Sequence, residues 1–152
     1  MQAYLAYNKK AFHYLDGRMD WTKPLDVYVE PSDMSGYFGD IVLLTDKNTL
    51  SAAEIFTLAL MNRTPQVIRI GDRTRGAFSD ILPRKLPNGW LFGLSNEQYA
   101  DEAGTVYEVT GIPPHIAVDM PTFLNALNVG KDITLERAIE QLIAEEQASH
   151  LH

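Results

Sequence analysis

The sequence predicts an α/β fold, and the order of its apolar segments is the reason. A continuous apolar run at 41–45 precedes a stretch at 51–61 with helical spacing, and a second apolar run follows at 67–70. A strand, a helix and a strand in this order are typical of a right-handed crossover between parallel strands. The chain has 152 residues, and no repeat or linker divides it, so we expect residues 1–152 to form a single domain.

The hydrophobic pattern is weak in the first residues and clearer in the segments at 25–30 and 51–61. The first residues are apolar without clean periodicity, and we expect a short helix that leads into a strand. The run at 25–30 is rich in β-branched and aromatic residues and predicts a strand, which Pro31 ends. In the helix at 51–61, five apolar residues share one face and are expected to pack inward: Ala52, Ile55, Phe56, Ala59 and Leu60.

The second half predicts a hairpin, a short strand and a final helix. The hairpin strands at 81–86 and 90–95 flank Asn88-Gly89, which favours a two-residue turn because both positions tolerate positive φ. A further strand is expected at 105–109. The last helix has apolar residues from Leu135 to Ile143, with Asp132 or Thr134 as its N-cap and a frayed polar end.

The composition excludes several classes of protein. The net charge of −7 and the lack of a basic cluster argue against a nucleic-acid partner. The absence of cysteine excludes disulfides and thiolate chemistry, and no apolar run is long enough for a membrane span. We find no phosphate loop, dinucleotide fingerprint or metal-ligand spacing, so no cofactor or metal is expected. The sequence is compatible with a homo-oligomer.

Ser51 is the first candidate for chemistry, because it stands where the loop after the 41–45 strand enters the helix. Backbone N–H groups at a helix start are unpaired and can bind a developing oxyanion, and Ala52 is the expected donor. The alternative is structural. Ser51 and Glu54 have the spacing of a capping box, in which both side chains only satisfy helix-end donors.

The sequence motifs around Ser51 resemble those of a known family. IVLLTDKNTLSAAEIFTLAL is similar to the nucleophile segment of the tail-specific (C-terminal-processing) serine peptidases, family S41. VIRIGDRTRGAFSD resembles the family's Gly-(Glu/Asp)-x-Thr-x-Gly strand end, and YEVTGIPPH resembles its Tyr-Glu-x-x-Gly-Ile-x-Pro-Asp segment. The family's terminal helix is similar to DITLERAIEQL. The resemblance covers roughly residues 25 to 145 in order.

This chain departs from the family pattern at the general base. Members with a Ser-Lys dyad carry lysine just after the Thr-x-Gly motif, where this chain has Ala77. The tricorn-like branch instead uses a histidine far before the serine together with a glutamate, and the glutamate matches Glu108. His13 does not lie in a family-like setting, and His115 replaces an aspartate. The resemblance thus implies a histidine from outside this chain.

The resemblance implies a ClpP/crotonase-like spiral fold that is incomplete at its N-terminus, with an added β-hairpin and a C-terminal helix. It implies a serine endopeptidase that hydrolyses peptide bonds through an acyl-enzyme on Ser51, and an isolated chain with little activity. The same resemblance suggests a periplasmic or extracytoplasmic location. Two alternatives stay open: a binding protein on the same scaffold, and an unrelated crotonase-like domain in which Ser51 only caps its helix.

Two further residues are candidate substrate contacts. Gly76 lies at the turn where Arg73 and Arg75 could bind a carboxylate, although a structural ion pair explains these residues equally well. Glu97 follows the predicted hairpin and could line a substrate groove, with surface polarity as the alternative.

Overall fold

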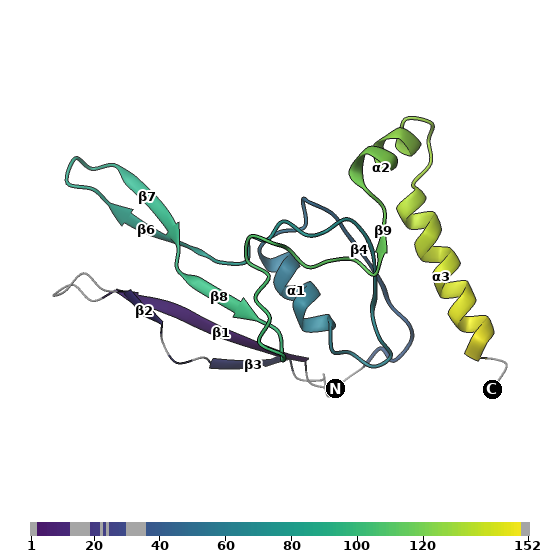
Figure 1. Cartoon of the computed structure of the whole chain (residues 1–152), viewed down its shortest axis with the longest axis horizontal. Helices are drawn as coiled ribbons and strands as arrows, with labels where there is room; N and C mark the ends of the chain where they lie inside the picture. The colour runs from purple at the N-terminus through teal and green to yellow at the C-terminus, as the bar shows by residue number, and fades with distance from the viewer. Residues whose placement is uncertain (1–2, 13–18, 22, 24, 30–35, 150–152) are drawn as a thin grey trace.

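The computed structural model describes residues 3–12, 19–21, 23, 25–29 and 36–149, and it contains parallel and antiparallel sheets with three helices in those residues (Figure 1). The mixed α/β fold agrees with the prediction from the apolar pattern. The elements fall into an antiparallel sheet near the N-terminus, a parallel sheet that carries the crossover, a separate hairpin and a C-terminal helical part.

The N-terminal sheet is built on one long strand. β1 (Ala3–Phe12) pairs antiparallel with β2 (Met19–Trp21), β3 (Leu25–Val29) and β8 (Glu97–Ala100). The expected short helix at the start is therefore wrong, because the first described residues join a ladder. Tyr and Leu residues suit a strand when partner strands are present, and local periodicity could not show those partners.

The parallel sheet contains the predicted crossover. β4 (Val42–Thr45) pairs in parallel with β5 (Ile68–Gly71), and β5 pairs in parallel with β9 (Ile116–Ala117). Helix α1 (Ala52–Leu60) connects β4 to β5. The carboxyl ends of β4 and β5 therefore lie together, and the loop that leads to Ser51 leaves the sheet from that edge.

The inward face of α1 agrees only in part with the expected one, since Ala59 is buried and Ile55 packs against the core as predicted. Its buried residues include Glu54, Thr57 and Leu58, whereas the side chain of Phe56 is 57% exposed. The prediction assumed that apolar residues turn inward. In the fold, the burial of a carboxylate and a hydroxyl is tolerated because both are hydrogen-bonded: Thr57 donates to the Ala53 carbonyl, and Glu54 has the partners described below.

The hairpin of β6 (Ile81–Lys85) and β7 (Leu91–Ser95) is confirmed, but its turn is longer than predicted. The Leu86 N–H donates to the Trp90 carbonyl, and the Gly89 N–H donates to the Leu86 carbonyl. Gly89 has φ +88, whereas Asn88 is not among the residues with positive φ. This is the three-residue arrangement, a turn at 87–88 followed by a left-handed glycine, and Pro87 suits its first central position.

The C-terminal part contains two helices. α2 (Met120–Leu127) begins after Asp119, whose side chain accepts from the Thr122 N–H. α3 (Ile133–Ser149) is capped by Asp132, one of the two predicted caps, and it extends past Glu146, beyond which we expected fraying, as far as Ser149; residues 150–152 lie outside the described residues. The expected strand at 105–109 is reduced to a single bridge between Val106 and Ala100.

Two apolar clusters hold these elements together. The first joins α1 to the segments around Phe78 and Ile112, with Leu58 and Ala59 from the helix. The second lies between the parallel sheet and α3, and it contains Ile70, Val118 and Ala138. The first cluster brings α1 against the segments 76–78 and 107–112, which contain the residues of the candidate site.

Candidate active site around Ser51

Ser51 is held in a strained backbone conformation at the start of α1. Its φ is 53° and its ψ is −122°, values that a residue with a Cβ rarely adopts. Its hydroxyl makes no cap hydrogen bond to the helix. The capping-box alternative is therefore wrong for Ser51. Backbone strain of this type costs on the order of 1–3 kcal/mol and persists where the surrounding contacts impose it.

The first turn of α1 leaves one N–H group without an acceptor among the described residues. The Ser51 N–H donates to the Ala77 carbonyl at 2.9 Å, and the Ala53 and Glu54 N–H groups donate to the carbonyls of Leu50 and Ser51. No described residue accepts from the Ala52 N–H. This donor lies next to the Ser51 hydroxyl at the positive end of the helix, where a negative oxygen is stabilised.

The segment 76–78 forms hydrogen bonds with Ser51, Glu54 and Glu108. The Glu54 carboxylate accepts from the Gly76 N–H at 2.6 Å and from the Ala77 N–H at 2.8 Å. Glu108 Oε2 accepts from the Phe78 N–H at 3.2 Å. Since the Ala77 carbonyl accepts from Ser51, the nucleophile candidate and Glu108 contact neighbouring residues of one segment. The structure therefore brings Ser51 and Glu108 into one region of the fold.

Close backbone contacts fix the position of Glu108. The Val109 N–H donates to the Gly76 carbonyl at 2.7 Å, and Val109 has a φ of 69°. A Cβ on Gly76 would lie 2.6 Å from the Val109 carbonyl carbon and 2.8 Å from the Gly111 nitrogen. Only glycine fits between these chains, so Gly76 allows the segment that carries Glu108 to approach the segment beside Ser51.

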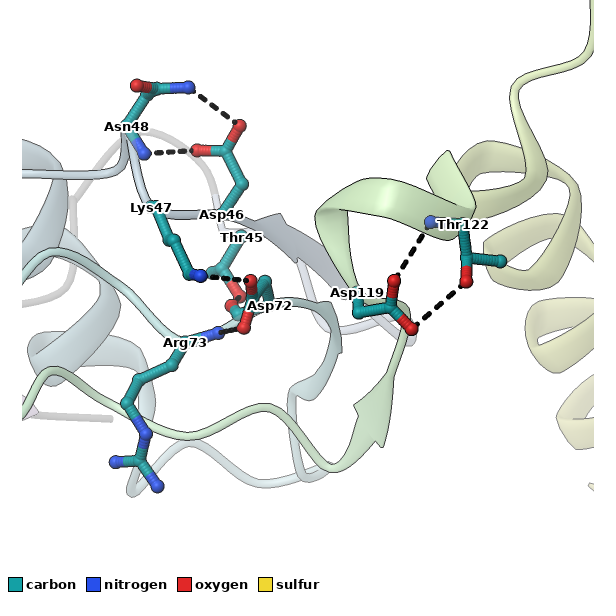
Figure 2. Close-up of polar contacts among 8 residues, drawn as sticks. All are labelled: Thr45, Asp46, Lys47, Asn48, Asp72, Arg73, Asp119 and Thr122. Carbon is teal, nitrogen blue, oxygen red and sulfur yellow. Dashed lines mark hydrogen bonds and ion pairs between the residues drawn. The ribbon is translucent and has the colours of Figure 1, made fainter. Parts of the chain in front are cut away.

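The loop before Ser51 is organised by Asp46. Its Oδ1 accepts from the Asn48 N–H (Figure 2). The same Oδ1 accepts from the Thr49 N–H, and the Asp46 N–H donates to the Thr49 hydroxyl. Figure 2 also shows Lys47 Nζ beside Asp72 Oδ2, which lie 3.6 Å apart. The loop is thus closed by its own turn and anchored to the end of β5, which limits the positions open to Ser51.

The two predicted substrate contacts already have partners within the fold. Gly76 is buried, and both its N–H and its carbonyl are used by Glu54 and Val109. Glu97 is 7% exposed, and its Oε2 accepts from the Asp80 N–H and the Tyr99 hydroxyl. Burial, with the charge of Glu97 and this hydrogen bond adding to it, raises the pKa of Tyr99 to about 12. A role for either residue in substrate binding stays a prediction.

Neither a lysine nor a described histidine lies beside Ser51 as its base. Residue 77, where the family resemblance places the dyad lysine, is an alanine. The Nδ1 atom of His115 accepts from the backbone N–H of Arg69, and the backbone N–H of His115 donates to the Arg69 carbonyl. Partial burial, with the charge of Arg69 adding to it, lowers the pKa of His115. His13, His150 and His152 lie outside the described residues.

A cavity of about 260 Å³ lies elsewhere, between the carboxyl ends of β4 and β5 and the two C-terminal helices. It is lined by Thr45, Asp46, Asp72, Phe123 and Asp132 among others, and neither Ser51 nor Glu108 is part of it. Within the described residues, no group of three acidic or histidine side chains could hold a metal ion. None of the helices described is both long and apolar enough to cross a membrane.

The sequence profile of peptidase family S41 matches residues 7–118, which is most of the chain and includes Ser51, Gly76 and Glu108. The chain belongs to peptidase family S41. This membership shows a peptidase-type domain and confirms the resemblance that the sequence motifs indicated. No curated protein matches the sequence.

Solved structures place this S41 chain among peptidases. A candidate peptidase from Parabacteroides merdae is 30% identical, with a TM-score of 0.73 over 90% of this chain and 42% of its own. Mature CPAF complexed with lactacystin is 20% identical, with a TM-score of 0.64 over 87% of this chain and 27% of its own. The chain thus spans less than half the length of these relatives, and its mixed α/β fold agrees with an incomplete S41 spiral.

Two residues that hold the candidate site together were not recognised from the sequence. Glu54 was interpreted only as half of a capping box, and Val109 was not considered. The signal for Glu54 was its spacing from Ser51, which is correct for a capping box but does not show which donors reach its carboxylate. The positive φ of Val109 had no signal, since valine rarely adopts it.

Proposed function

We propose that this chain supplies the nucleophile, an oxyanion donor and the orienting carboxylate of a serine endopeptidase. The observation that carries the proposal is the conformation of Ser51, whose strained backbone leaves the hydroxyl outside any capping bond while the next N–H group has no acceptor among the described residues. Membership of family S41 supports hydrolysis of a protein or peptide substrate.

In the proposed reaction, the Ser51 hydroxyl attacks the carbonyl carbon of the scissile peptide bond. The Ala52 N–H donates to the oxygen that becomes negative, an interaction worth roughly 3–4 kcal/mol in the transition state. A histidine from outside this chain accepts the Ser51 proton and passes it to the leaving amine. The Glu108 carboxylate orients that histidine and stabilises its charged form. Water then hydrolyses the acyl-enzyme.

The experiment is labelling of the full-length protein with a fluorophosphonate probe, which reacts quickly only with an activated serine. We expect labelling of the wild type and of a Ser95→Ala control, since Ser95 is an exposed residue of the hairpin, and loss of labelling in Ser51→Ala. Equal labelling of Ser51→Ala and the wild type would contradict the assignment of the nucleophile.

A binding protein on the same scaffold is the second candidate, because no base is described beside Ser51. Ala77 stands where the resemblance places the dyad lysine, and His115 Nδ1 already accepts a hydrogen bond from the Arg69 N–H. Under this alternative the full-length protein binds peptides but reacts with no fluorophosphonate. An extracytoplasmic location and a homo-oligomer also stay proposals, the first drawn from the family resemblance.

A further inference from the structure

Glu54 is a fully buried carboxylate whose partners lie outside its own helix. Its side chain is 0% exposed, and its two oxygens separately accept from the N–H groups of Gly76 and Ala77 at 2.6 and 2.8 Å. A buried carboxylate is costly unless hydrogen bonds compensate its lost hydration, and two short bonds from adjacent peptide groups provide this compensation. Such a bidentate contact also restricts the orientation of both peptide groups.

The peptide groups on either side of Ala77 connect this carboxylate to Ser51. The Ala77 N–H donates to Glu54, and the Ala77 carbonyl accepts from the Ser51 N–H at 2.9 Å. One residue earlier, the Arg75 N–H donates to the Thr49 carbonyl at 2.9 Å. Residues 75–77 are therefore hydrogen-bonded to residues 49–51 along one side and to Glu54 along the other.

This arrangement differs from a capping box. In a capping box the glutamate would accept from the N–H of the N-cap residue, which here is Ser51. The Ser51 N–H instead donates to Ala77, and Glu54 acts on the far side of that same residue. If Ala77 were displaced, Ser51 would lose the partner of its N–H and could relax from its φ of 53°.

We propose that Glu54 is a positioning residue, which holds Ser51 in its reactive backbone conformation through Ala77, whose N–H bonds Glu54 and whose carbonyl bonds Ser51. The proposal rests on the proposed function for its effect on the reaction, but not for its structural part. Glu54 contacts neither substrate nor the reacting atoms. Its effect is on the direction in which the Ser51 hydroxyl and the Ala52 N–H point.

Substitution of Glu54 by glutamine tests the proposal in the full-length protein. An amide has one acceptor oxygen, and its NH2 group would face a second N–H donor, so one of the two bonds is lost. We expect the second-order rate constant of fluorophosphonate labelling to fall by about 10²-fold, since a shift of about 1 Å in a reacting group has effects of this size. Glu54→Asp keeps both acceptors and should recover part of the rate.

Peptide hydrolysis and a matched control separate positioning from general destabilisation. With a fluorogenic peptide substrate, Glu54→Gln should lower kcat and leave KM within about twofold, since ground-state binding does not depend on the Ser51 hydroxyl. Asp101→Asn removes the charge of another carboxylate with two partners, Thr105 and Tyr107, and should label at the wild-type rate. Each rate is taken per folded protein, as measured by circular dichroism.

Amide hydrogen exchange at Ser51 distinguishes failure of this proposal from failure of the proposed function. If the wild type is not labelled, the peptidase proposal fails, and faster exchange of the Ser51 N–H in Glu54→Gln would still support positioning by Glu54. A folded Glu54→Gln with wild-type labelling and exchange would overturn it. If Glu54→Gln does not fold, Glu54→Asp is judged by the same two measurements.

Discussion

The Ser51 N–H and the Ala77 carbonyl oxygen form a hydrogen bond of 2.9 Å, which removes one backbone donor from the first turn of α1. The Ala52 N–H remains as the donor beside the Ser51 hydroxyl, with no acceptor among the described residues. Ala77 also occupies the place of the dyad lysine of some S41 peptidases. The residue at that place thus contributes its backbone to the site, and its side chain cannot act as a base.

Glu108→Gln should lower peptide hydrolysis without a large change in stability. Glutamine can still accept from the Phe78 N–H, which Glu108 Oε2 now does at 3.2 Å, but it carries no charge to stabilise an imidazolium. By analogy with triads that lose this carboxylate, we expect kcat to fall by about 10²- to 10⁴-fold. Casein hydrolysis by the full-length protein is the measurement.

Glu102→Gln is the control for Glu108, because Glu102 is exposed and accepts a hydrogen bond from the Asn62 side chain, away from Ser51 in the sequence. Wild-type hydrolysis by Glu108→Gln would show that the carboxylate does not take part in catalysis.

Gly76→Ala should strongly destabilise the chain. The new Cβ would lie 2.6–2.9 Å from three backbone atoms of Val109, Thr110 and Gly111, at a φ of +77°. We expect a loss of about 3 kcal/mol or more in the free energy of unfolding, measured by urea denaturation. Gly104→Ala has a similar φ of +83° with no atom within 4 Å, so it should cost only about 1–2 kcal/mol. Similar losses in the two variants would argue against the close approach at Gly76.

Leu58→Ala and Phe56→Ala should separate the buried and exposed faces of α1. Leu58 is 2% exposed and packs with Phe78 and Ile112, so we expect its truncation to cost about 2–5 kcal/mol. Phe56 is 57% exposed, and its truncation should change stability by less than about 1 kcal/mol. Thermal or urea unfolding measures both. A larger loss of stability for Phe56→Ala than for Leu58→Ala would support the inward face that the apolar spacing predicted.

His115 should make the stability depend on pH below about 6.5, the ordinary value for histidine. Partial burial and Arg69 lower its pKa in the folded state, so the unfolded chain binds a proton at a higher pH than the folded chain does. Its contribution to stability is therefore complete above pH 6.5 and decreases as the pH falls toward the lowered pKa.

The measurement for His115 is the free energy of unfolding against pH for the wild type and for His115→Asn. The difference between the two curves should shrink below pH 6.5, because only the wild type loses this contribution. A constant difference would mean that the hydrogen bond from the Arg69 N–H to neutral His115 Nδ1 does not contribute to the pH dependence of stability.

Local patterns in the sequence were sufficient for several elements and for the family. The apolar runs at 41–45 and 67–70 identified β4 and β5 with errors of one residue, because continuous apolar runs are typical of parallel strands. The motifs around Ser51, Gly76 and Glu108 indicated family S41, since chemistry and tight turns require particular residue types at particular spacings. The short segments β8 and β9 had no such pattern.

The sequence by itself determined that a hydroxyl stands at the start of a helix after an apolar strand, because neighbouring residues along the chain specify that order. Only the tertiary structure decided which donors reach Glu54 and Glu108, since Gly76 is 22 positions from the first and Phe78 is 30 positions from the second. Hydrogen-bond partners so distant along the chain depend on how the segments pack. The same packing, through the Ala77 carbonyl, places Ser51 in a conformation that its local sequence does not favour.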